Sequence, residues 1–145
     1  MNIDWIIPCR YAEVHDNLAT IVGAGIDTWW FPTLPATVQV GIVVRLLAAS
    51  DELGPDHTHT VRNIIRDPSG GPLSDLGGPF QVGTTAEADS ARTEWLNGVA
   101  LVTMIQFEAT EPGTYTFEHI VDESSKSVPL HIAIGPPPGL NPSSE

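Results

Sequence analysis

Alternating apolar and polar positions run through much of this chain and predict strands. From Val38 to Leu46 every second residue is apolar, so these side chains share one face of an extended segment, whereas a helix would scatter them. The same alternation runs from Val128 to Ile134. Between Val99 and Phe107 apolar residues first occupy both faces, which predicts a central strand covered on both sides at one end.

Weaker patterns predict further strands around these three. The segment from Leu18 to Trp30 is interpreted as one strand, in which Gly23 and Gly25 indicate either a bulge or the close approach of another backbone segment. The glycine pairs 70–71 and 77–78 are interpreted as turns, and Asp67 is expected to supply a side-chain acceptor to the first of them. Shorter strands are predicted at 3–7, 61–65 and 115–121.

One segment has helical character. Thr84 and Glu87 have the spacing of a capping box and predict a short surface helix over 84–92. About seven to eight short strands, separated by frequent Gly and Pro turns, predict an all-β fold: an immunoglobulin-like or related β-sandwich. A partly closed barrel uses the same signals and stays an open alternative. The expected domain spans 1–135, and the proline-rich residues 136–145 are expected to form an extended tail.

Two short stretches resemble known families. Glu111 to Phe117, E-P-G-T-Y-T-F, resembles the Gly-x-Tyr corner of immunoglobulin-like sandwiches, which implies a Tyr115 hydroxyl bonded back to the backbone. The opening C-R-Y-A-E-V from Cys9, followed by G-A-G-I-D ending at Asp27, is similar to an uncharacterised bacterial and phage-associated family of unknown function. That resemblance implies a compact β domain and brings no activity with it.

The net charge of the chain limits the classes of partner that it can bind. The chain has 18 acidic and 6 basic residues, a net charge of −12, which disfavours nucleic acid and anionic membranes as partners. Cys9 is the single cysteine, so no intrachain disulfide can form. The first residues do not have the pattern of a secretory signal, and no apolar run reaches the roughly 18 residues that a bilayer requires. A cytoplasmic location is expected.

Four histidines are candidate metal ligands. His57 and His59 would point the same way on a strand, and His119 and His131 lie on predicted C-terminal strands that could complete a set. The alternative is that these are separate, mostly surface histidines. No G-x-S-x-G elbow is present, and Cys9 is expected to be buried and inert, so no catalytic residue and no cofactor is predicted.

Three consecutive aromatic residues at 29–31 predict an interaction surface. If Trp30 faces inward, then Trp29 and Phe31 face outward beside Asp27. Exposed aromatic residues of this kind usually mark a binding site. The first functional hypothesis is therefore a non-catalytic interaction or assembly module, which binds a protein partner or further copies of itself as a homo-oligomer. The second is a small-ligand or carbohydrate-binding sandwich, and the third is a metal-dependent enzyme that uses His57 and His59.

Overall fold

Strand-forming segments occupy most of the chain in the computed structural model, which describes residues 1–16, 18–83 and 97–137. The 3-10 turn η1 (Ser50–Glu52) lies between the fifth and sixth strands. The strands are β1 (Asn2–Cys9), β2 (Tyr11–His15), β3 (Leu18–Val22), β4 (Thr28–Phe31), β5 (Ala36–Ala48), β6 (His59–Arg66), β7 (Pro72–Phe80), β8 (Asn97–Ala109), β9 (Gly113–Val121) and β10 (Ser124–Ile134). The predicted all-β sandwich is confirmed, with ten strands in the described residues rather than seven or eight.

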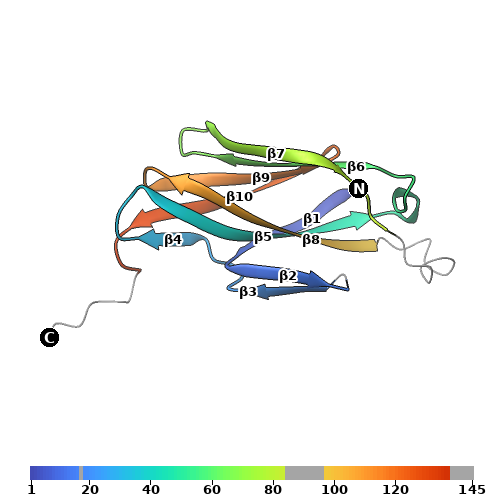
Figure 1. Cartoon of the computed structure of the whole chain (residues 1–145), viewed down its shortest axis with the longest axis horizontal. Helices are drawn as coiled ribbons and strands as arrows, with labels where there is room; N and C mark the ends of the chain where they lie inside the picture. The colour runs from blue at the N-terminus through green and yellow to red at the C-terminus, as the bar shows by residue number, and fades with distance from the viewer. Residues whose placement is uncertain (17, 84–96, 138–145) are drawn as a thin grey trace.

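Two larger sheets and one hairpin make up the fold. A five-stranded sheet has the order β4-β10-β9-β6-β7, and a three-stranded sheet has the order β1-β5-β8. All neighbours are antiparallel except β4 and β10, which run parallel. The hairpin β2-β3 forms a third, two-stranded sheet. Figure 1 shows β6 and β7 along one border of the molecule and the hairpin at the opposite border.

The main core lies where the two larger sheets share one cluster of buried side chains. The alternating residues of β5 (Val38, Val40, Ile42, Val44 and Leu46) are all buried there. Tyr115 and Phe117 of β9 and Leu130 of β10 contribute from the five-stranded sheet. A second cluster on the opposite face of β5 joins Val43 to Cys9 and Ala12, so β5 is covered on both faces.

The strand predicted over 99–107 differs from expectation in one respect. Its two faces are covered at one end, since Leu101 packs against the main core and Val102 against the hairpin cluster. Among the described strands, however, β8 is the edge of its sheet and β5 is the central strand.

The segment from Leu18 to Trp30 is two strands rather than one. β3 ends at Val22, and β4 begins at Thr28. Gly23 and Gly25 between them adopt φ angles of 67° and 76°, a left-handed backbone conformation that makes a turn instead of a bulge. The predicted helix at 84–92 lies outside the described residues, as do residues 138–145 of the predicted tail.

Tyr115 makes the backward hydrogen bond that a tyrosine corner implies. Its hydroxyl donates to the backbone carbonyl of Glu111 at 3.0 Å. Gly113 between them has a φ of 151°. Within residues 1–16, 18–83 and 97–137, no helix is both long and apolar enough to span a bilayer.

Candidate functional site

The aromatic step on β4 faces the opposite way from the prediction. Trp29 is 9% exposed and belongs to the core, whereas Trp30 is 36% exposed. Phe31 is half-buried and packs against the same core, while Asp27 is exposed in the turn before β4. The predicted outward orientation of Trp29 is therefore wrong, and Phe31 is exposed only in part.

His57 and His59 do not form a pair. His57 is exposed in the turn before β6, while His59 is 7% exposed at the start of that strand. His59 Nδ1 lies 2.8 Å from Asp122 Oδ2, and its Nε2 lies 2.7 Å from the Glu52 carbonyl oxygen. The Glu52 carbonyl, together with the Asp122 carboxylate, raises the pKa of His59 above its usual value. With both ring nitrogens engaged, His59 links η1 to the β9–β10 turn.

The other two histidines also have separate partners. His119 faces inward on β9, where its Nδ1 lies 2.6 Å from Asn63 Oδ1 and its Nε2 has no hydrogen-bond partner. Burial lowers the pKa of His119 to about 4. His131 Nδ1 lies 3.0 Å from the hydroxyl of Thr114, its cross-strand neighbour. Among the described residues, no group of three or more His, Cys, Asp or Glu side chains is placed to hold a metal ion.

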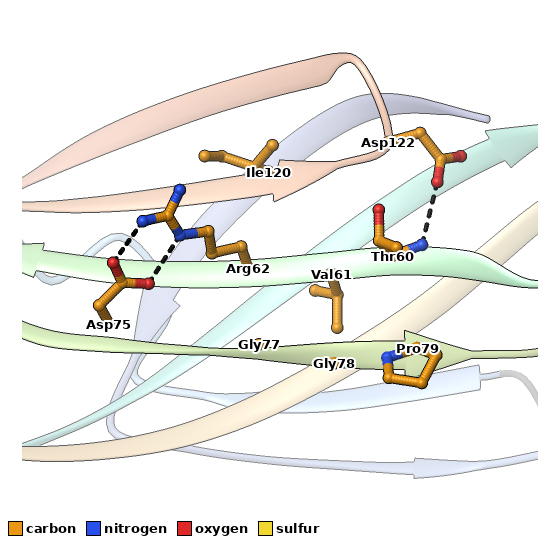
Figure 2. Close-up of a pocket in the computed structure, with 9 residues that line it drawn as sticks. All are labelled: Thr60, Val61, Arg62, Asp75, Gly77, Gly78, Pro79, Ile120 and Asp122. Atoms are coloured by element: carbon orange, nitrogen blue, oxygen red, sulfur yellow. Dashed lines mark hydrogen bonds and ion pairs between the residues drawn. The ribbon is translucent and has the colours of Figure 1, made fainter.

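A groove of about 480 Å³ crosses the outer face of β6, β7 and β9. Figure 2 shows its lining side chains on the three strands, with Arg62 reaching from β6 to Asp75 on β7. Its lining residues are Thr60, Val61, Arg62, Asp75, Gly77, Gly78, Pro79, Ile120 and Asp122.

Each of the two carboxylates that line the groove accepts a hydrogen bond from β6. Arg62 Nε donates to Asp75 Oδ1 at 2.7 Å, and this hydrogen bond lowers the pKa of Asp75. At the other end, the backbone N–H of Thr60 donates to Asp122 Oδ1 at 3.0 Å. Between them Gly77 lines the groove with backbone alone.

A family model matches most of the chain. The model of a family of unknown function, DUF6941, matches residues 4–133. The chain belongs to this DUF6941 family. Neither the comparison with curated proteins nor that with solved structures found a match.

The β7 edge of this DUF6941 domain was not predicted from sequence. Gly77 and Gly78, which were interpreted as a turn, lie inside β7. Their backbone pairs with Arg62 and Val61 of β6. Proline and glycine are tolerated on edge strands, where one side of the backbone has no partner strand. A strand starting with Pro72 and carrying Pro79 near its end is the available signal for such an edge.

Exposed apolar side chains lie on this edge strand. Leu73 is 45% exposed and Leu76 is 67% exposed. In the order of the five-stranded sheet, β7 stands at the end and is hydrogen-bonded to β6 alone among the described strands. The DUF6941 domain thus combines an open backbone edge, two exposed leucines and the adjoining groove in one place.

Cys9 has the environment expected of an unreactive thiol. Its side chain is fully buried, and Sγ donates to the Gly41 carbonyl oxygen at 3.3 Å. Burial raises the pKa of Cys9 above its usual value. Because the thiolate is the nucleophilic form, these surroundings oppose reactivity.

Proposed function

We propose that this DUF6941 domain is a non-catalytic assembly module that associates with further copies of itself through the β7 edge. The observation that supports this most is the edge of β7 away from β6, which pairs with no strand within residues 1–16, 18–83 and 97–137 and has Leu73 and Leu76 exposed along it. Unpaired N–H and C=O groups are a template for another strand, and exposed leucines beside them add apolar area to bury.

The environment of the candidate catalytic groups also supports a non-catalytic role. Cys9 is buried, and both ring nitrogens of His59 already have partners within the fold. His131 pairs with Thr114 across two regular neighbouring strands, which is a common way to stabilise a sheet. These contacts hold the fold together, and they do not involve β7, which pairs with β6 alone among the described strands.

We also propose a cytoplasmic location and a bacterial or phage source. The location is supported by Cys9, the single cysteine, because small secreted domains commonly depend on disulfides. The source is supported by the preference for arginine over the single lysine, Lys126. A protein partner fits the net charge of −12 better than nucleic acid or an anionic membrane does.

Sedimentation velocity across a concentration series, followed by native mass spectrometry, tests the self-association. The expected result is a reversible species at twice the 15.5 kDa mass of the chain that grows with concentration. Reversibility is expected because strand addition through one edge buries a small area, as in weak complexes. A chain that sediments as a monomer at every concentration would overturn the proposed function.

A further inference from the structure

The edge of β7 differs from the other edges in the described part of the fold. β4 has only four residues, and β2 and β3 have five each. Gly98 and Ala100 on the edge strand β8 take part in other interactions. The edge strand β1 contains Pro8, and its Ile3 N–H and Asp4 carbonyl already bond to Ser124 and Lys126 of β10. β7 spans nine residues, of which 73–78 are free of proline and keep their N–H donors. This run carries the exposed Leu73 and Leu76, so it is the edge best suited to accept another strand.

We propose that a second copy of this chain adds its β7 antiparallel to the first, with the two-fold axis passing beside Leu76 and perpendicular to the sheet. This inference rests on the proposed function and specifies its interface. The result is one continuous sheet across two sandwiches. In this register Leu76 of each copy faces Leu76 of the other, Ser74 faces Gly78, and Asp75 faces Gly77.

Side-chain alternation restricts the register to a few choices. An axis perpendicular to the sheet keeps the outer face of one copy continuous with the outer face of the other, so residues that oppose each other must share a face. The axis must then lie beside a residue rather than between two residues. Centring it on Asp75 would oppose two like charges, which is destabilising. Centring it on Leu76 avoids this and buries the more exposed leucine.

The same register also places residues of complementary size and charge opposite each other across the two copies. Asp75 of one copy falls opposite Gly77 of the other, and Gly77 is the cross-strand neighbour of Arg62. Because Gly77 has no side chain, the guanidinium of Arg62 can reach across it toward the incoming carboxylate. Arg62 already holds Asp75 of its own chain at the groove. In the dimer each Arg62 would lie between two aspartates, one from each copy.

Cysteine crosslinking tests the register directly. In Leu76→Cys the two thiols lie on directly opposed residues, whose Cβ atoms are about 5 Å apart in an antiparallel pair. In Ser74→Cys the same residue of the two copies is offset by four positions, about 14 Å along the strand. A short bis-maleimide should therefore crosslink most of Leu76→Cys into dimer and little of Ser74→Cys. The unsubstituted chain is the control, since Cys9 is fully buried and should not react.

A charge substitution completes the test. Leu76→Asp should abolish the dimer in sedimentation velocity, while Leu18→Asp, at a leucine 75% exposed on the hairpin, should leave it unchanged. A dimer that persists in Leu76→Asp and does not crosslink through position 76 would overturn the β7 edge as the interface in both proposals, and would leave only self-association through another surface. Equal crosslinking at 74 and 76 would overturn the register. A monomer at every concentration would overturn both proposals.

Discussion

His119 is a buried histidine with one free ring nitrogen. Its side chain is 1% exposed, Nδ1 lies 2.6 Å from Asn63 Oδ1, and the ring stacks on Phe117 with centroids 6.3 Å apart. A proton added to this ring would place a charge inside the core, where desolvation is costly. His119 is therefore neutral in the folded chain at neutral pH.

Protonation of His119 should make stability depend on pH. The unfolded chain takes up this proton near the ordinary pKa of about 6.5, whereas burial lowers the pKa of His119 to about 4 in the folded chain. The free energy of unfolding should therefore be highest above about pH 6.5. It should fall by about 3 kcal/mol as the pH drops from about 6.5 to below about 4. Urea unfolding of the wild type and of His119→Gln at a series of pH values measures the difference, and the variant should show a flatter dependence.

His57 provides the matched control for this measurement. Its side chain is exposed in the folded chain, so His57→Gln removes a histidine without disturbing the core. If His119→Gln and His57→Gln gave the same slope between about pH 4 and pH 6.5, burial of His119 would not be the cause.

Whether an individual side chain faces the core or the solvent was the feature that the sequence predicted least well. Alternation places side chains only while the strand continues, and the turn through Gly23 and Gly25 ends β3 before β4 begins. Counting in twos from Val22 therefore assigned Trp29 to the surface and Trp30 to the core, the reverse of what is found. The His59–Asp122 contact could not be predicted either, because 63 positions separate the two residues.

Two adjacent glycines on β7 have different surroundings. A Cβ at Gly77 would lie 2.4 Å from the Val61 carbonyl oxygen, far inside the normal contact distance, whereas a Cβ at Gly78 would meet nothing within 4 Å. The close approach of β6 and β7 therefore requires glycine at one position and not at the other.

Alanine substitution at the two glycines should have opposite effects on stability. Gly77→Ala forces the strands apart and should lower the free energy of unfolding by about 1–3 kcal/mol. Gly78→Ala removes freedom from the unfolded chain at an unstrained position and should be neutral or stabilising by up to about 1 kcal/mol. Chemical denaturation of both variants measures this, and equal losses would show that the close approach at Gly77 does not decide the outcome.

At the level of elements, local signals were sufficient where they lay within one segment. The alternation on β5 predicted its buried face, and Asp67 accepts hydrogen bonds from the N–H groups of Ser69 and Gly71, as its turn predicted. β7 was missed because an edge strand has few side chains to bury and so shows no clean alternation. Its content of proline and glycine is also typical of a loop.

At the scale of the whole molecule, net charge opposes the association that the β7 edge favours. Each copy carries a formal charge of −12, so two copies repel each other before they touch. Arg62 offers a local attraction to Asp75 of the second copy, which selects the register more than it adds affinity. Long-range repulsion and local attraction are both screened by salt, but the repulsion involves many more charges.

Sodium chloride should therefore strengthen the dimer. Between about 0.01 M and about 1 M salt the screening length falls from about 30 Å to about 3 Å, so the repulsion between the two copies is largely removed. The dimer fraction at one protein concentration, measured by sedimentation velocity, should rise over this range. Arg62→Gln leaves Asp75 of both copies unpaired, so it should weaken the dimer most at low salt. The dimer fraction of this variant should therefore rise more steeply with salt than that of the wild type. A dimer that instead dissociates as salt rises would mean that local ion pairs at the β7 edge outweigh the net charge of the chain.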